Sequence, residues 1–370
     1  MAGFEFKTKG KMKTKTIILL CIFLLVLLVS LSQFGLYADG SVAKNRCAGM
    51  SLRECSKHDN CEIVKRRFIF VKRQKCIEKS STPSRLIKPG DYQKSINIEG
   101  VERTYLLHIP LGYDPNKKYP LVMVFHGGGG TGQQVATKTG FNTYADRDGF
   151  IVLYPNGIEN SWNDRRGTTK SDKQGIDDVG FVSALIEHLT TIFPIDKNRI
   201  YASGISNGAI FSHRLACKLS SKIAAIGVVA GEIPEAIVSS CGLSSPMSRI
   251  AIHGVADPLN PFLGGETRGG GGGRILSAQA TAEIWAKHNG CSLTPSKTQV
   301  TPTVNDGTSV EKWAYPNCKK GVDVILYAVN GMGHAWPPQD PEVSRISGKT
   351  SHNIDTTKVI WAFFKSHSKV

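Results

Sequence analysis

Short apolar runs alternate with longer amphipathic stretches from residue 95 to the end of the chain. The apolar runs are continuous and rich in Val and Ile, which is typical of strands buried on both faces of a parallel sheet. We expect strands at 121–125, 150–154, 200–203, 223–229, 249–253 and 322–329, a hairpin of 96–99 with 103–109, and helices at 180–193, from 207, at 277–289 and at 353–366. This alternation predicts an α/β fold, a mostly parallel sheet covered by helices on both faces, with ligand chemistry at the carboxyl ends of its strands.

The first 38 residues do not follow this pattern. Five Lys precede an uninterrupted apolar run at 17–29, and Ala38 ends the segment. A basic stretch followed by an apolar run of this length predicts a secretory signal peptide. A retained membrane anchor is the alternative, because the segment continued to Ala38 is just long enough to span a bilayer.

Residues 39–88 form a small basic module and linker before the larger domain at 89–370. The module contains four cysteines, Cys47, Cys55, Cys61 and Cys76. A segment of this size buries little core, so we expect two disulfides to hold it, in a connectivity that the sequence leaves open. The apolar run 68–71, between clusters of Lys and Arg, predicts a short strand. We expect the module either to attach the protein to an anionic surface or to act as a solvated spacer.

Charge and cysteine usage narrow the class of protein. The net charge is +16, but 39–88 contain thirteen Lys and Arg against five Asp and Glu, and 89–370 retain only +4. This distribution argues against a nucleic-acid enzyme with a basic active domain.

A second group of four cysteines comprises Cys217, Cys241, Cys291 and Cys318. Even groups of cysteines without C-x-x-C pairs favour disulfides in an extracellular or periplasmic compartment over zinc binding.

The segment 204–208 has the sequence Gly-Ile-Ser-Asn-Gly and lies between a predicted strand and a predicted helix. In a G-x-S-x-G pattern a sharp strand-to-helix turn exposes the serine hydroxyl, and the glycines let strand and helix approach closely. The turn also places Ser206 at a helix N-terminus, where free N–H groups favour negative charge. Because Gly and Ser are common, the pattern alone is a weak signal, and its partners decide the interpretation.

A nucleophilic serine needs a histidine base and a carboxylate that orients it, and on this fold they follow in the order Ser, Asp, His at strand ends. Asp257 comes four residues after the strand 249–253, whereas Asp306 lies in a turn and Asp323 begins a strand. The remote alternatives for the acid are Glu235 and Glu266. His334 follows the strand 322–329 in a glycine-rich loop, and the other late histidines lie in or beside helices. We therefore predict Asp257 and His334 as the partners of the serine.

Two backbone N–H groups are expected to stabilise the oxyanion. One belongs to Asn207, directly after the nucleophile. The other should come from the loop after the strand 121–125, where four glycines follow His126 in the HGGG form of esterases and lipases. Gly128 is the preferred donor and Gly129 the second. A phosphate-binding loop is not expected, since no Lys-Ser/Thr follows at the required spacing.

Five motifs occur in order along 95–368: His126 with four glycines, Gly-Ile-Ser-Asn-Gly-Ala from 204, His-Gly-Val-Ala-Asp from 253, Trp285 with Asn-Gly-Cys from 289, and Gly-His-Ala-Trp-Pro from 333. Together they resemble the polyhydroxybutyrate depolymerase and feruloyl esterase family of secreted α/β-hydrolases. The resemblance implies a triad of Ser206, Asp257 and His334, an ester substrate, no cofactor and no metal. It also implies the disulfides Cys217–Cys241 and Cys291–Cys318. The module at 39–88 is not part of the family pattern.

These features predict a secreted serine carboxylic-ester hydrolase that acts through an acyl-enzyme. The expected substrates are polyhydroxybutyrate-type oligoesters, or feruloyl or acetyl esters of plant cell walls. A serine peptidase on the same fold, or a non-catalytic surface-binding protein with a vestigial hydrolase domain, are the alternatives. We expect Trp162 and Trp336 at the rim of the substrate site, with the glycine-rich segment 264–274 as a further rim candidate. The oligomeric state is not determined by the sequence.

Overall fold

A computed structural model describes residues 51, 61–68, 71–78, 87–242, 244–269, 271–319, 321–339 and 343–369. The chain divides into two compact units, Met1–Arg85 and Leu86–Val370. The predicted signal peptide or anchor lies outside the described residues. Within the described part of the chain, no helix is long and apolar enough to cross a membrane.

The first unit contains an antiparallel hairpin of β1 (Cys61–Phe68) and β2 (Val71–Glu78). Phe68 pairs with Val71 at the end of this ladder, so the prediction of one short strand at 68–71 is wrong. Phe68 instead ends β1, and Val71 begins β2. The register also places Arg66 opposite Arg73, and Arg67 opposite Lys72.

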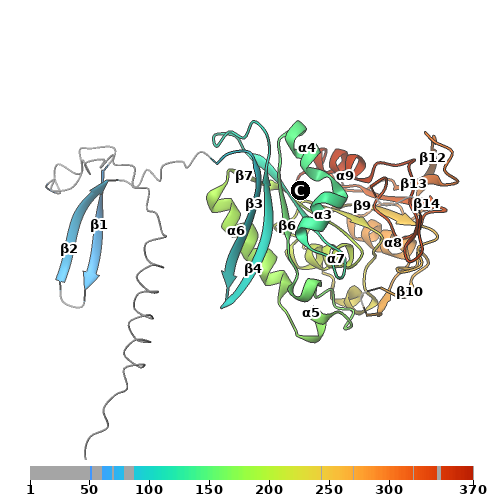
Figure 1. The fold of residues 1–370 in the computed structure, drawn as a ribbon, viewed down its shortest axis with the longest axis horizontal. Coiled ribbons are helices and arrows are strands. Elements are labelled where there is room, and N and C mark those ends of the chain that lie inside the picture. The colour runs from blue at the N-terminus through green and yellow to red at the C-terminus, as the bar shows by residue number, and fades with distance from the viewer. Residues whose placement is uncertain are drawn as a thin grey trace, which may run out of the picture. The chain divides into compact units, whose positions relative to one another are not determined.

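The second unit is built on a ten-stranded sheet (Figure 1), in the order β12-β13-β14-β9-β8-β7-β5-β6-β4-β3. The six strands from β14 to β6 are parallel, and two antiparallel strands extend each edge. The strands are β3 (Gly90–Ile98), β4 (Val101–Ile109), β5 (Tyr119–Phe125), β6 (Ile151–Pro155), β7 (Ile195–Ile205), β8 (Ala225–Val229), β9 (Ser248–Gly254), β12 (Ser296–Val300), β13 (Ser309–Tyr315) and β14 (Val324–Asn330). The predicted α/β-hydrolase architecture with a mostly parallel sheet is confirmed.

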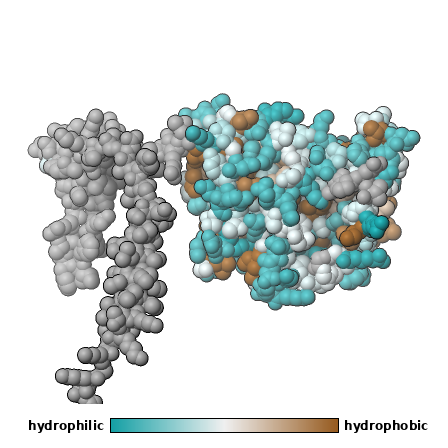
Figure 2. Space-filling model, viewed as in Figure 1, coloured by the Kyte–Doolittle hydropathy of each residue, from teal (hydrophilic) through white to brown (hydrophobic). Residues whose placement is uncertain are grey.

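Helices cover both faces of this sheet (Figure 1) and enclose two apolar clusters. One cluster contains side chains of α6 (Asp178–Ile192), α7 (Asn207–Leu219) and α8 (Ala278–Asn289). The other contains side chains of α3 (Gly132–Thr139), α4 (Phe141–Asp148) and α9 (Thr356–Lys365). The outer surface on the side shown in Figure 2 is mostly hydrophilic, with apolar side chains in small separate patches. Burial of apolar surface on both faces of the sheet therefore stabilises the unit.

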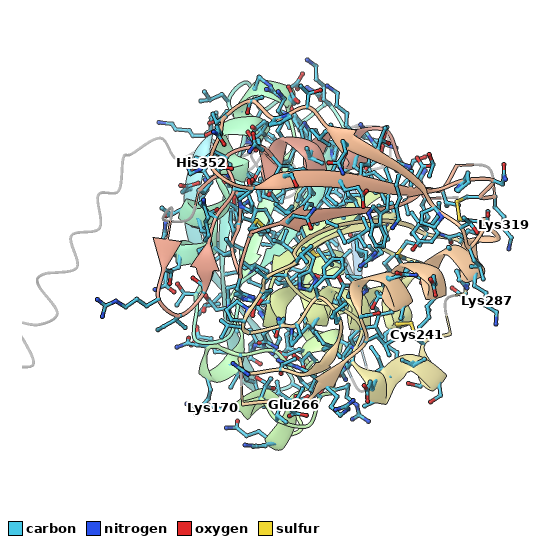
Figure 3. The ribbon with its side chains drawn as sticks, turned by 90° about the vertical axis from the view of Figure 1, so that its right-hand side faces the viewer. Lys170, Cys241, Glu266, Lys287, Lys319 and His352 are labelled. Atoms are coloured by element: carbon cyan, nitrogen blue, oxygen red, sulfur yellow. A yellow bond between two sulfur atoms is a disulfide. The ribbon has the colours of Figure 1, made fainter. Side chains whose placement is uncertain are left out.

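Two disulfides tie helices of the second unit to neighbouring segments. Cys217 of α7 is bonded to Cys241, and Cys291, just after α8, is bonded to Cys318, just after β13. Figure 3 labels Cys241 at the first of these bonds. Both pairings implied by the family resemblance are confirmed, whereas the pairing of cysteines 47–76 lies outside the described side chains.

The loops that follow β9 and β14 are hydrogen-bonded to each other at the carboxyl edge of the sheet. The Val255 N–H donates to the Val329 carbonyl, and the Ala256 N–H donates to the Met332 carbonyl, each over 2.9 Å. A Cβ added to Gly254, at the end of β9, would lie 2.2 Å from the backbone oxygen of Gly333. The two loops approach this closely only because residue 254 has no side chain.

We therefore expect Gly254→Ala to destabilise the second unit by about 1–3 kcal/mol, because backbone atoms in a tightly packed region cannot move away cheaply. Gly242→Ala is the matched control, since a Cβ on Gly242 would meet no atom within 4 Å. Urea unfolding of the two variants measures the difference. Equal midpoints would contradict the close packing of these loops.

Candidate active site

Ser206 lies at the turn between β7 and α7, with φ 57° and ψ −123°. A non-glycine residue in this region of backbone space is strained, and such strain persists only where the surrounding structure fixes it. Cβ atoms added to Gly208 and Gly204 would lie 2.2 and 2.8 Å from the backbone oxygen of Phe125. Because only glycine fits at these two positions, β5, β7 and α7 meet closely and hold Ser206 at the carboxyl edge of the sheet.

Asp257 and His334 are hydrogen-bonded to each other. His334 Nδ1 lies 2.8 Å from Asp257 Oδ2, and the N–H groups of Leu259 and Asn260 donate to Asp257 Oδ1 over 2.8 and 2.9 Å. Burial alone would raise the pKa of Asp257, but hydrogen bonds from His253 and His334 outweigh burial and lower this pKa well below 3.8. Because the ionised carboxylate accepts from Nδ1, Nε2 of His334 is the nitrogen that can take a proton.

Ser206 and His334 line the same cavity, which has a volume of about 510 Å³. This volume lies within the range of small-ligand sites. The aliphatic side chains of the lining belong to Val135, Ile205 and Leu259. Two polar residues of α3, Gln134 and Lys138, also line the cavity. Gly269 also lines the cavity, so the glycine-rich segment 264–274 reaches the site at that residue. The structure thus brings the serine and the Asp257–His334 pair to one hollow, although they come from three separate loops.

The loop after β5 passes directly beside the serine. A Cβ on Gly127 would lie 3.4 Å from Ser206 Cβ. His126 is buried, accepts a hydrogen bond from the Gly157 N–H at Nε2 over 3.0 Å, and donates from Nδ1 to the Gly127 carbonyl over 2.8 Å. Burial lowers the pKa of His126 to about 4. His126 is therefore a neutral ring that fixes the loop rather than a second base.

Gly128 and Gly129, the two candidates for the first oxyanion donor, differ in the contacts that they make, and Asn207 is the expected second donor. Gly128 lines the cavity, whereas Gly129 donates its N–H to the Asn160 carbonyl over 2.7 Å. Asn207 is the first residue of α7, and the first N–H groups of a helix have no intrahelical acceptor. The geometry therefore favours Gly128 over Gly129, and leaves the Asn207 N–H available at the helix start.

The Asn207 side chain has a function that the sequence pattern did not reveal. Its Nδ2 donates to Asp164 Oδ2 over 2.7 Å, and its Oδ1 accepts from the Trp162 N–H over 2.8 Å. Asp164 is fully buried and also pairs with Arg166 at 2.9 Å. These contacts attach the loop after β6 to the start of α7. Sequence spacing offers no signal for them, since more than forty positions separate the partners.

The prediction that Trp162 and Trp336 form the rim is wrong, because both side chains are fully buried. Trp162 stacks on Phe211 with ring centroids 5.1 Å apart, and its Nε1 donates to the His126 carbonyl over 3.0 Å. Trp336 donates from Nε1 to Thr357 Oγ1 over 2.9 Å. Each indole packs beneath a loop of the site, where burying a large ring stabilises more than exposing it at a rim.

A group of buried charged residues behind Asp257 was also missed. It comprises Glu232, Arg249 and His253, each at most 1% exposed. The sequence pointed to this group only through His253, which is the first residue of the His-Gly-Val-Ala-Asp motif. Neither in this group nor in the rest of the described residues do three His, Cys, Asp or Glu side chains converge in a way that would hold a metal ion.

Comparison with known proteins gives several matches. A family model described as esterase PHB depolymerase matches residues 103–257. The chain is 28% identical over 279 residues to the putative esterase NocK of Nocardia uniformis subsp. tsuyamanensis, covering 71% of this chain and 80% of that relative. It is 29% identical to a probable feruloyl esterase C of Aspergillus terreus, covering 65% of this chain and 79% of that one. It is 31% identical to feruloyl esterase B of Piromyces equi, covering 63% of this chain and 42% of that one.

The residues matched by the family model include the turn at Ser206 and end at Asp257, whereas His334 lies beyond them. The family model and these relatives agree on the same class of reaction. These matches support a place for this chain in the polyhydroxybutyrate depolymerase and feruloyl esterase family, and the chain is a carboxylic ester hydrolase.

Proposed function

We propose that the protein is a secreted serine esterase in which Ser206 is the nucleophile, His334 the general base and acid, and Asp257 the residue that orients His334. The hydrogen bond of 2.8 Å between His334 Nδ1 and Asp257 Oδ2, at a cavity that Ser206 also lines, is the observation that supports this most directly. The three residues have the types and the chain order that serine hydrolysis on this fold requires.

The reaction proceeds in two steps. Ser206 Oγ attacks the ester carbonyl carbon while His334 Nε2 takes the hydroxyl proton, and the N–H groups of Gly128 and Asn207 hold the oxyanion. The tetrahedral species collapses, the alcohol leaves with the proton from His334, and Ser206 stays acylated. Water then attacks the acyl carbon with His334 as base, and the carboxylic acid leaves as Ser206 recovers its proton.

For the substrate we propose polyhydroxybutyrate-type oligoesters, or feruloyl or acetyl esters of cell-wall polymers. The names of the relatives support an ester of this kind. The lining of Val135, Ile205 and Leu259 suits an apolar acyl group, and Gln134 adds a polar side chain to the same cavity. The cavity volume of about 510 Å³ lies in the range of sites for small ligands.

Secretion and surface attachment are further parts of the proposal. The bonds Cys217–Cys241 and Cys291–Cys318 support an oxidising compartment, as does the predicted signal peptide. For the module at 39–88 we propose attachment to an anionic surface. The composition supports this, because residues 39–88 contain thirteen Lys and Arg against five Asp and Glu.

Ser206→Ala should lower kcat for p-nitrophenyl butyrate by about 10⁴-fold or more, since no other group forms the acyl-enzyme. Ser212→Ala is the matched control. Its hydroxyl is buried in the same helix and bonds to the Gly208 carbonyl over 2.8 Å, away from the cavity. Steady-state rates and circular dichroism of both variants decide the matter. A folded Ser206→Ala enzyme with near-normal turnover would refute the nucleophile.

Asp257→Asn should lower kcat by about 10³–10⁴-fold with little change in KM, because the amide favours the wrong tautomer of His334. Asp323→Asn is the control, since Asp323 pairs with His367 at 3.0 Å in a similar carboxylate–histidine contact outside the cavity. Full kinetics of both variants test the assignment. A loss of the same size in the Asp323 variant would mean that the effect is not specific to the site.

Replacing Arg66, Arg67, Lys72 and Arg73 by Gln should abolish binding of the full-length protein to vesicles that contain anionic lipid, without changing its esterase rate. A control with the same change of net charge replaces four exposed lysines of the second unit, Lys117, Lys118, Lys173 and Lys287. Co-sedimentation at low and high salt measures binding, because surface charge attraction is screened by salt. Equal loss in both variants would indicate net charge alone, and would contradict a role for the hairpin.

A further inference from the structure

A line of buried charged side chains runs inward from Asp257, away from the cavity. His253, in β9, is fully buried, and its Nε2 lies 2.9 Å from the Asn260 carbonyl oxygen and 3.4 Å from Asp257 Oδ2. Its Nδ1 lies 3.0 Å from Glu232 Oε1, in the loop after β8. Arg249, also in β9, donates from a terminal nitrogen to Glu232 Oε2 over 2.5 Å. The mechanism described above uses only the first member of this line.

The contacts of His253 define its protonation state. Each ring nitrogen faces only acceptors, a carboxylate on one side and a carbonyl with a carboxylate on the other. A neutral imidazole donates from one nitrogen only, so only the imidazolium satisfies both contacts. Burial lowers the pKa of His253, but hydrogen bonds to Asp257 and Glu232 outweigh burial and raise this pKa to about 10.

The other titratable groups around this line do not cancel the charge of His253. His213 of α7 lies 3.9 Å from Glu232, and burial lowers its pKa well below 6.5, so it is neutral. Tyr315 of β13 adjoins Arg249, and burial raises its pKa to about 12, so it is also neutral. The line is therefore Asp257 negative, His253 positive, Glu232 negative and Arg249 positive.

We propose that His253 is a positioning residue for the hydrolytic reaction: a permanently protonated ring, held by Glu232 and Arg249, that fixes the Asp257 carboxylate and limits how strongly His334 holds a proton. His253 and His334 approach the same oxygen, Asp257 Oδ2, at 3.4 and 2.8 Å. This inference rests on the proposed function, because it assumes that His334 is the base.

The physical reason for this effect of His253 is that His253 and His334 both approach Asp257 Oδ2, so the charge of one ring affects the protonation of the other. An isolated buried carboxylate would strongly favour the protonated form of His334, which cannot accept the proton of the serine. A fixed positive charge behind the carboxylate opposes this effect. His253 Nε2 and His334 Nδ1 lie 3.4 and 2.8 Å from Asp257 Oδ2, so the two nitrogens are near each other. Two unit charges about 6 Å apart, at an effective dielectric constant of about 20, interact strongly enough to displace a titration by about one to two pH units.

His253→Gln in the full-length protein should move the acid limb of the kcat/KM profile to higher pH by about one to two units. It should also lower kcat at neutral pH by about tenfold, with little change in KM, since a group that positions a catalytic residue typically has an effect of this order. His213→Gln is the matched control, because it removes a neutral, equally buried histidine beside the same glutamate. An unshifted acid limb in a folded His253→Gln enzyme, or an equal shift in the control, overturns the proposal.

A measurement on the unaltered protein covers the case in which His253→Gln does not fold. Histidine ring ¹⁵N spectra identify His253 by its contact with the Phe262 ring, 5.6 Å away between centroids. We expect both ring nitrogens to remain protonated at pH 8.5, and a ring that loses a proton below pH 7.5 overturns the proposal. This readout does not depend on activity. Loss of the proposed function would instead appear as turnover by Ser206→Ala, so the two failures are distinguishable.

Discussion

The close approach of three backbone segments at Ser206 is the constraint on which the rest of the site depends. The carbonyl oxygen of Phe125 occupies the space where Gly204 and Gly208 would otherwise carry side chains. This contact joins β5, β7 and α7, and it leaves the serine in a strained conformation that points out of the sheet edge. The loop after Phe125 then has to pass beside the serine, which brings the glycines at 127 and 128 to the cavity.

The charge of each buried histidine around the site depends on whether neighbouring carboxylates outweigh the effect of burial. His126 and His253 are both at most 1% exposed, so desolvation favours the neutral ring at each. Burial lowers the pKa of His126 to about 4, since its hydrogen bond to the Gly127 carbonyl offsets burial only in part, whereas hydrogen bonds to carboxylates on both sides of His253 outweigh burial and raise its pKa to about 10. One ring therefore fixes a loop as a neutral donor and acceptor, and the other forms part of a line of alternating charge.

Much of the architecture follows from local pattern. The apolar runs predicted the parallel strands, because a strand buried on both faces must be apolar along its whole length. The edge strand β12 and its neighbour β13 were not predicted. β12 is largely exposed, so the pattern of apolar residues that marks a buried strand is absent from it. The run at 68–71 was misassigned because an apolar quartet has the same composition whether it is one strand or the reversal between two.

The sequence by itself determined the α/β fold, through the alternation of apolar runs with amphipathic stretches, and the order of Ser206, Asp257 and His334, through residue types that follow predicted strands. The tertiary structure alone decided what surrounds them. Trp162 is buried because Phe211, 49 positions later, stacks on it, and His253 is charged because Glu232, on another strand's loop, faces it. Such contacts join residues that are distant in the chain. The local spacing of residue types therefore does not predict the burial and charge that these contacts produce.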